Sequence, residues 1–346
     1  MTGMTEQSHF VPQSYLKGWS ADGKRVWMYR LLVSTQSVPA WRKRSIRGIA
    51  FHQHLYTRLA AGAETDEIEK WFNQEFETPA QEALDRVRQN SRLTPTHWKA
   101  LARFVAAQHV RTPARFLEMM QRWTVDLKPM IEATLRSSVA DLEHIRHEDT
   151  PLIPRTPTHE EYLPSRVTVR KSHAGGGEIG LEVVAGRGLW LFAIRHLLTS
   201  TLHALEGHKW TVLNATSGME WMTSDDPVIP LNYYAPGRYD FKGGWGNKGT
   251  EILLPLSPHH LLYTRVGHRD RPQRDIEPSI AKHFQRFIAE HAHRALFTVR
   301  PTSEVENLRP RVVDRKQYEQ ETQMWNRWHE EQTRAELELQ ADRPGE

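Results

Sequence analysis

The chain has 346 residues, of which 38% are hydrophobic, so it is long enough to form one large domain or two smaller ones. Its 46 basic and 42 acidic residues leave a formal net charge of +4, which is weak support for a dedicated nucleic-acid-binding protein. The sequence has no cysteine, which excludes disulfides, iron–sulfur clusters, thiolate zinc sites and cysteine nucleophiles.

Neither a membrane span nor a secretory signal is expected. No run of apolar residues approaches the roughly 18 that cross a bilayer. The opening stretch MTGMTEQSHF lacks both a basic start and an apolar run. We therefore expect a cytoplasmic protein without a membrane partner.

The first half of the chain is predicted to be mainly helical after an irregular beginning. Residues 9–60 indicate irregular structure with short strands, such as the aromatic-rich RVWMYR at 25–30. Apolar residues at helical spacing then predict helices over about 65–90, 94–112 and 113–147. Thr94 is the expected N-cap of the second helix, with Pro95 in its first turn. Pro113 either separates the last two helices or bends a single one.

The second half is predicted to be rich in strands. A connection with four prolines at 149–164 leads to a hairpin whose strands are joined through HAGGG. The expected strands lie at 166–172, 178–186, 209–216, 219–231, 250–257 and 260–266. Two helices are expected at 188–205 and 276–296, followed by a charged helical tail.

Together these elements predict an α+β fold with mostly antiparallel strands. We expect one domain over 1–312, made of a helical subdomain at about 60–148 and a β-rich subdomain at about 165–300. Residues 313–346 form the predicted tail, which is expected to dock on its own domain through its tryptophans. The alternative is that this tail pairs with a second copy of the chain.

Four stretches in order resemble the bacterial domain of unknown function 4238 (DUF4238). They are HFVPQSYLKGWS (9–20), IEKWFNQEFE (68–77), QHVRTP (108–113), and TSDDPV (223–228) followed by LLPLSP (253–258). The resemblance covers roughly residues 9–299 and implies a fold and a set of suspect residues, but no activity. Trp19 stands where the family commonly has Phe, and Gln285 or Arg286 stands about where an Asn is expected.

Nine polar residues in these stretches form the candidate site: His9, Tyr15, Glu69, Glu77, Gln108, Arg111, Ser224, Asp225 and Asp226. His9, Gln108 and Arg111 are the candidate catalytic residues, with Arg111 suited to clamp a phosphate. Glu69, Glu77 and Asp225 are the candidate ligands of a divalent cation, Mg²⁺, Mn²⁺ or, with His9, Zn²⁺. Eight residues separate the two glutamates, which places them about 80° apart around an ideal helix.

A structural interpretation of the same residues stays open. Arg111 could pair with Glu69 or Glu77 inside the protein, because buried charges need partners. His9 could hydrogen-bond to hold the N-terminal segment in place. The stretch TSDDP could be a turn in which Ser224 and Asp225 bind backbone groups.

Two further histidine patterns are weaker. RFIAEH (286–291) has the Arg-x4-His spacing of a family of helical ribonucleases, but the neighbouring predicted elements are strands. FHQHLY (51–56) offers His52 and His54 as a chelating pair, and two exposed loop histidines are the preferred interpretation because no third ligand is identified.

The sequence therefore supports three functional hypotheses. The first is a metal-dependent hydrolase or nuclease of a defence or toxin-like system. The second is a non-catalytic sensor or interaction protein whose buried polar network is structural. The third is a protein that binds nucleic acid or a nucleotide without cutting it.

Overall fold

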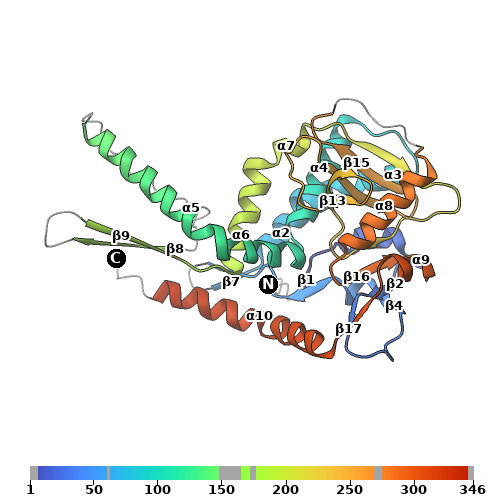
Figure 1. Cartoon of the computed structure of the whole chain (residues 1–346), viewed down its shortest axis with the longest axis horizontal. Coiled ribbons are helices and arrows are strands. Elements are labelled where there is room, and N and C mark those ends of the chain that lie inside the picture. The colour runs from blue at the N-terminus through green and yellow to red at the C-terminus, as the bar shows by residue number, and fades with distance from the viewer. Residues whose placement is uncertain (1–6, 61–62, 148–164, 172–176, 269–274, 342–346) are drawn as a thin grey trace.

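The computed structural model describes residues 7–60, 63–147, 165–171, 177–268 and 275–341. The protein has the predicted α+β architecture. In Figure 1 a body of sheets and helices occupies the right of the view, and three elements extend from it to the left. These elements are α5 (Pro113–His147), the hairpin β8 (Ser165–Lys171) and β9 (Gly177–Val183), and α10 (Arg315–Ala341).

The larger sheet of the body is an antiparallel sheet that is buried on both faces. Its strand order is β10 (Thr211–Asn214), β15 (His260–Arg265), β14 (Glu251–Ser257), β12 (Ile229–Ala235) and β13 (Arg238–Asp240). Side chains alternate along β14, so Ile252 and Leu254 pack with the helices of the first half. Leu253 faces the opposite way and packs with Phe287 and Ile288 of α8 (Pro278–His291).

A smaller sheet combines strands from both ends of the chain. Its order is β11 (Thr223–Ser224), β16 (Ala295–Thr298), β2 (Arg25–Arg30) and β4 (Trp41–Ser45), all antiparallel. Two further strand pairs lie next to it. β1 (Gln7–His9) pairs with β5 (Phe51–Gln53), and β3 (Leu32–Val33) pairs in parallel with β17 (Val312–Val313).

The first long helix is continuous from Glu67 to Arg88 but contains a π-helical segment. It consists of α2 (Glu67–Phe72), η3 (Asn73–Glu77) and α3 (Thr78–Arg88). Pro79 has no N–H, so the carbonyl of Glu75 one turn earlier cannot receive its helical hydrogen bond. Nη2 of Arg103 donates a hydrogen bond to that carbonyl oxygen instead, at 3.5 Å. The helix thus widens for one turn where its regular bonding is interrupted.

Helix α4 (Pro95–Val110) begins as the sequence predicts. The side chain of Thr94 and that of His97 cap each other's backbone N–H, and Pro95 takes the first helical position. The predicted helix at 188–205 is composed of α6 (Arg187–His196), the π-helical η4 (Leu197–Thr201) and α7 (His203–Glu206). The remaining short elements are α1 (Gln13–Leu16), η1 (Lys17–Trp19), η2 (Ile46–Gly48), β6 (Arg58–Ala60), β7 (Ala63–Thr65) and α9 (Ser303–Leu308).

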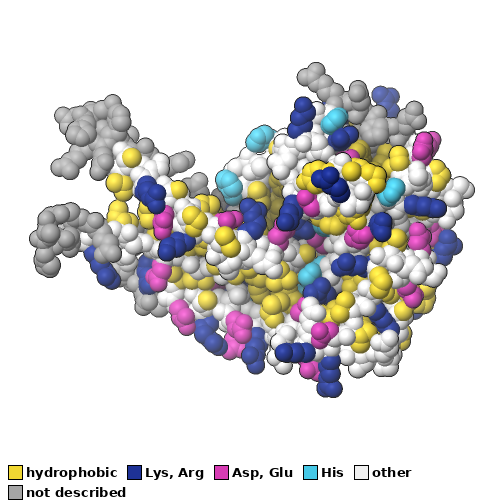
Figure 2. All heavy atoms as spheres, viewed as in Figure 1, with side chains coloured by type: hydrophobic (Ala, Val, Ile, Leu, Met, Phe, Trp, Pro, Cys, Tyr) yellow, Lys and Arg dark blue, Asp and Glu magenta, His cyan; other side chains and the backbone are white. Residues whose placement is uncertain are grey.

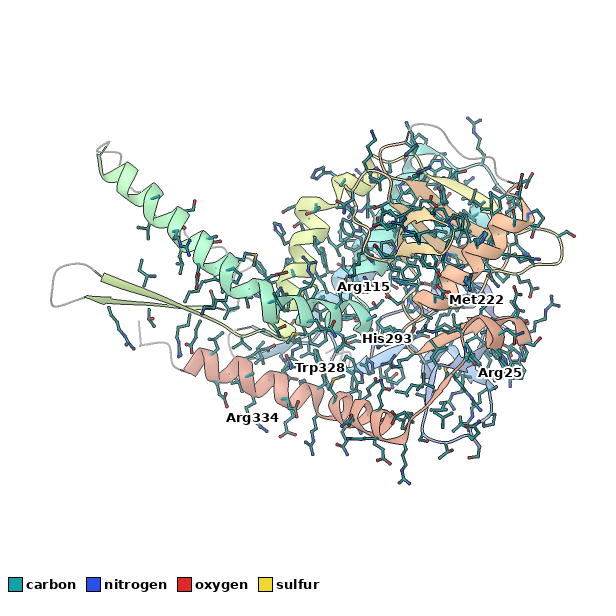
Figure 3. All side chains as sticks on the ribbon, viewed as in Figure 1. Arg25, Arg115, Met222, His293, Trp328 and Arg334 are labelled. Atoms are coloured by element: carbon teal, nitrogen blue, oxygen red, sulfur yellow. The ribbon has the colours of Figure 1, made fainter. Side chains whose placement is uncertain are left out.

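Helix α10 docks on the body of its own chain. Trp328 is buried against the ring of Phe116, at a centroid distance of 4.7 Å, and Figure 3 labels it where α10 meets the body. Arg187 at the start of α6 attaches the following turns of α10, because its guanidinium donates to both carboxylate oxygens of Glu336. The expectation that the tail docks on its own domain agrees with these contacts.

The predicted connection at 149–164 and most of the HAGGG turn lie outside the described residues. The flanking strands β8 and β9 pair in antiparallel register, as the sequence predicts. Within the described part of the chain, no helix combines the length and apolar character needed to cross a membrane.

Candidate functional site

The turn between α4 and α5 connects three polar environments. It consists of Arg111, Thr112 and Pro113, and all three residues are buried. Arg111 points into a charged cluster beneath the first long helix, and Thr112 binds Asp226. Pro113 lines a cavity under α10. The predicted motif QHVRTP is therefore the point at which these three environments meet.

The first environment, which we call the Arg111 cluster, contains His9, Glu69, Glu77, Gln108 and Arg111. The guanidinium of Arg111 is fully buried and donates from Nη1 to Glu77 at 2.7 Å and from Nε to the carbonyl of Phe10 at 3.1 Å. With the Gln108 amide oriented to satisfy both groups, its oxygen accepts from Nη2 of Arg111 at 2.6 Å. The guanidinium also lies over the ring of Phe72. Protein groups thus surround this cation.

The π-helical segment brings Glu69 to the same cluster as Glu77. An ideal α-helix would place the two residues about 80° apart, but a π turn takes up about one extra residue and reduces the angle to about 20°. Burial raises the pKa of Glu69 to about 7, although Arg111 acts in the opposite direction. Its Oε2 is buried without a hydrogen-bond partner among the described residues. Glu69 is the weakly satisfied member of the cluster.

His9 joins the Arg111 cluster through its backbone. Its backbone lies next to the carboxylate of Glu69, and Nε2 of its imidazole lies 3.4 Å from the side-chain amide nitrogen of Gln13. The ring is also tilted against Phe51, with centroids 5.4 Å apart. Burial lowers the pKa of His9, so its imidazole is mainly uncharged at neutral pH. These contacts hold the N-terminal segment against the body.

The second environment, the Asp226 cluster, contains Thr112, Arg115, Asp226 and His291. Thr112 donates to one carboxylate oxygen of Asp226 and Arg115 to the other, both at 2.8 Å. The His291 ring lies between Arg115, 3.0 Å from Nε2, and the carbonyl of Asp226, 3.0 Å from Nδ1. Burial opposes the charge of Asp226, but the Arg115 guanidinium holds its pKa below the usual range. This cluster is an ion pair closed by an uncharged imidazole.

The other residues of TSDDP bind backbone groups. Both carboxylate oxygens of Asp225 accept backbone N–H groups, from His293 at 3.0 Å and from Arg294 at 2.8 Å. Ser224 Oγ accepts the backbone N–H of Asp226 at 3.2 Å. Tyr15 lies apart from the Arg111 cluster, since its hydroxyl donates to the carbonyl of Pro255 at 2.6 Å. The structural interpretation of this turn therefore accounts for Ser224 and for both oxygens of Asp225.

The third environment is a cavity of about 420 Å³, which we call the arginine cavity. One face of the smaller sheet forms its floor, since Arg30, Met28 and Arg42 lie on that face through the pairing of β2 with β4. Residues 48–52 form a wall and α10 forms the roof. Its charged and imidazole-bearing lining residues are Arg30, Arg42, Arg44, His52, Asp225, His293, Arg294 and Glu321.

The lining of the arginine cavity is rich in positive charge. Arg294 donates from Nε to Glu321 of α10 at 2.7 Å. Arg30, Arg42 and Arg44 have no carboxylate partner among the described residues, although Arg30 lies against Tyr318. The cavity therefore presents three guanidinium groups that form no ion pair with a carboxylate of the described residues.

Three titratable groups of this cavity have strongly shifted pKa values. Burial raises the pKa of Asp225 to about 7, and the neighbouring Asp226 acts in the same direction. Burial lowers the pKa of His52 and of His293 to about 4. Both imidazoles are thus uncharged at neutral pH and able to accept a proton or a hydrogen bond. Figure 3 labels His293 near the middle of the molecule.

The structure divides the nine predicted site residues among different places. His9, Glu69, Glu77, Gln108 and Arg111 come together, Asp226 belongs to its own cluster, and Asp225 lines the cavity. The carboxylates of Glu69, Glu77 and Asp225 do not form a common ligand group. A different set of possible metal ligands does come together. Within the described residues, the one group of three His, Asp or Glu side chains whose ligand atoms lie within 4.8 Å of one another is His54, Glu64 and His329.

The weaker histidine patterns also have definite environments. His291 is buried in the Asp226 cluster, whereas Arg286 is half exposed and pairs with Glu290 at 3.0 Å. His52 and His54 are only partly exposed, because α10 covers them: His52 stacks on Trp325 and His54 on His329, each at 3.9 Å. The preferred interpretation of the pair as exposed loop histidines was wrong.

Gln285 has a structural role at the position where an Asn is expected. It is buried, and its amide donates from Nε2 to the carbonyl of Glu220 at 3.0 Å. The amide oxygen lies 3.5 Å from the backbone N–H of Met222. Gln285 thereby joins α8 to the segment that precedes TSDDP.

Sequence reasoning did not identify Arg30, Arg42 and Arg44 as members of the candidate site. Arg42 and Arg44 belong to WRKRS, a short charged run that is typical of a solvent-exposed edge strand. Their spacing of two residues was the available signal, since it places both side chains on one face of a strand. The opposite face of the cavity comes from α10, more than 270 residues later.

Residues 7–302 match the family described as "Protein of unknown function (DUF4238)", so the chain belongs to that family. The match spans most of the chain and includes the four motifs from which the resemblance was inferred. No curated protein and no solved structure matches the chain.

Proposed function

We propose that the protein binds a phosphate-bearing small molecule of nucleotide size in the arginine cavity. The observation that carries this proposal is the set of three cavity arginines, Arg30, Arg42 and Arg44, that lack a carboxylate partner among the described residues. Guanidinium groups bind phosphate oxygens through pairs of parallel N–H donors. A phosphate group would supply the negative charge that the cavity lining lacks.

The size and the walls of the cavity suit such a ligand. Its volume of about 420 Å³ falls in the range of small-molecule sites, which is roughly 300–1,000 Å³. The rings of Phe51 and Trp325 line it beside the arginines, so a flat base would find apolar surface next to the phosphate-binding groups. Arg42 and Arg44 are exposed at its edge, which leaves a route for the ligand.

Binding of a long nucleic acid has less support. Figure 2 shows basic and acidic side chains mixed over the visible face, with no continuous basic stripe on that face. Proteins that follow a nucleic-acid backbone usually present such a stripe. A cavity of limited volume with clustered arginines instead favours a compact anion or the end of a nucleic-acid strand.

The test is a binding panel with nucleoside mono-, di- and triphosphates and inorganic phosphate. Thermal stabilisation and calorimetry should detect at least one binder, because a ligand that binds only the folded state raises stability. The double variant Arg42→Gln/Arg44→Gln should lose this binding. Arg334→Gln is the matched control, since Arg334 lies on α10 away from the cavity and pairs with Glu330. No binder in the panel, or equal binding by the double variant, would overturn the proposal.

We keep hydrolysis of a phosphate ester, including a nuclease of a defence or toxin-like system, as a second candidate. It is favoured by His293 and Asp225, which both line the cavity. The pKa of His293 is lowered to about 4, so its imidazole is uncharged, and the pKa of Asp225 is raised to about 7, so its carboxyl group can take up or release a proton near neutral pH. His293 would take a proton from the attacking water. Joint metal ligation by Glu69, Glu77 and Asp225 has no support from the described residues, because their carboxylates do not form a common ligand group.

Hydrolysis is separable from binding by His293→Gln. This variant should retain the stabilisation by the bound nucleotide but lose turnover, measured by release of phosphate or of a nucleoside with Mg²⁺, Mn²⁺ or Zn²⁺ added. His203→Gln serves as the control because His203 is an exposed histidine outside the cavity. Turnover that persists in His293→Gln would remove this candidate and leave the binding proposal untouched.

A further inference from the structure

Helix α10 contacts the body of the protein near its start and near its end. Between these two contacts lies a cluster of side chains of the types that bind metal ions. Towards its start, Glu321 and Trp325 cover the arginine cavity. Towards its end, Arg187 binds Glu336. Between these contacts His329 meets His54, which follows β5, and Glu64 of β7.

The three side chains are already arranged around a small space. The imidazoles of His54 and His329 stack with centroids 3.9 Å apart, and Nε2 of His329 lies 2.9 Å from a carboxylate oxygen of Glu64. The three ligand atoms all lie within 4.8 Å of one another. His329 and Glu64 each expose about a third of their side chain, so an ion could enter from solvent and retain water ligands.

We propose that His54, Glu64 and His329 bind a divalent transition-metal ion that fastens α10 to the body. Two imidazoles and one carboxylate suit Zn²⁺, Co²⁺ or Ni²⁺, whereas Mg²⁺ and Ca²⁺ prefer oxygen ligands alone. The ligands come from three separate segments, so the ion would act as a cross-link between residues near the N-terminal strands and the last helix.

Binding requires small movements of the side chains. Metal–ligand bonds of about 2.1 Å place neighbouring ligand atoms about 3.0–3.4 Å apart, whereas the three ligand atoms lie within 4.8 Å of one another, so the groups have to approach by up to about 1.8 Å. The nearly parallel rings also have to rotate, because an ion must lie close to the plane of each imidazole that binds it. Both changes involve side-chain torsions at partly exposed residues.

The outer contacts of the two imidazoles differ. Nδ1 of His54 lies 3.2 Å from the hydroxyl of Thr57, which can accept a hydrogen bond from Nδ1–H and so leave Nε2 free to bind the ion. Nδ1 of His329 lies 3.2 Å from Nη1 of Arg187, which can only donate. A metal at Nε2 of His329 therefore needs the ring proton to move to Nδ1, and this Arg187 contact opens. Arg187 keeps its two bonds to Glu336.

The experiment uses the full chain after removal of metals with a chelator. We expect Zn²⁺ to raise the melting temperature, Mg²⁺ to have little effect, and Co²⁺ to give visible absorption bands typical of nitrogen and oxygen ligands. The variants His329→Gln and Glu64→Gln should lose the Zn²⁺ shift and the Co²⁺ bands. His203→Gln should keep both, because His203 is exposed and lies outside the cluster.

Limited proteolysis provides a second measurement that does not depend on melting behaviour. Zn²⁺ should slow cleavage within α10 of the wild-type chain and leave its rate unchanged in His329→Gln. If His329→Gln does not fold, His54→Gln takes its place. The proposal fails if Zn²⁺ has no effect on the wild-type chain, or if the variants respond to Zn²⁺ as the wild-type chain does. Neither result depends on whether the arginine cavity binds a nucleotide.

Discussion

The Arg111 cluster and the arginine cavity use the same residue types in opposite ways. In the cluster, the guanidinium of Arg111 is fully buried and bound by Glu77, Gln108 and a backbone carbonyl. In the cavity, Arg42 and Arg44 face open space without a carboxylate partner among the described residues. A charge whose partners are all protein groups supports the fold, whereas a charge without partners is available to a ligand.

Removal of Arg111 should have the largest effect on stability. Arg111→Ala leaves the partly buried Glu77 without its cation and the carbonyl of Phe10 without a donor. We expect the free energy of unfolding to fall by about 3–5 kcal/mol, measured by urea denaturation. Arg86→Ala is the control, because the exposed Arg86–Glu82 pair should contribute at most about 0.5 kcal/mol. Equal losses in both variants would contradict the contrast drawn above.

Glu69→Gln should produce a smaller effect that depends on pH. The folded state raises the pKa of Glu69 from 4.5 to about 7, so it binds the proton more tightly than the unfolded state. The contribution of Glu69 to stability is therefore fully present below about pH 4.5 and is lost as the pH rises to about 7. Glutamine cannot ionise, so the variant should be more stable than the wild-type chain at pH 8 by about 1–3 kcal/mol.

The two proteins should have nearly equal stability at pH 4.5, where Glu69 of the wild-type chain is protonated. Urea denaturation of both at pH 4.5, 6 and 8 would measure the difference. A difference that is independent of pH would mean that Glu69 titrates normally and that the cluster is less sealed than its contacts indicate.

Changes in the arginine cavity should affect stability least. The double variant Arg42→Gln/Arg44→Gln removes two exposed side chains that have no ion pair with the described residues. We expect the free energy of unfolding without ligand to change by less than about 0.5 kcal/mol. A loss above about 2 kcal/mol in urea denaturation would show that these arginines support the fold and would remove the distinction between the two regions.

The sequence predicts local structure better than the meeting of distant segments. Helical periodicity and capping residues such as Thr94 identify the helices, and the predicted strand at 25–30 coincides with β2. The grouping of Glu69 with Glu77 depends on the π-helical segment, which a regular helical pattern does not include. The separation of Asp225 from the glutamates depends on the turn at Thr112, where two polar environments diverge.

The roof of the cavity was the least predictable part. α10 has few apolar residues, so the sequence predicts docking through its tryptophans but not the surface on which they dock. Its position over His52 and His54 explains why these histidines are partly buried and not free in a loop. Such contacts depend on tertiary packing between segments far apart in the chain.

The pairing of β2 with β16 has a consequence for biosynthesis. Arg30 lies opposite Ala295, roughly 265 residues further along the chain. At elongation rates of about 5–20 residues per second, the ribosome needs on the order of tens of seconds to deliver the partner strand. Throughout that interval the β16 side of RVWMYR has no native neighbour, so the backbone N–H and C=O groups on that side stay without their strand partner until β16 is synthesised.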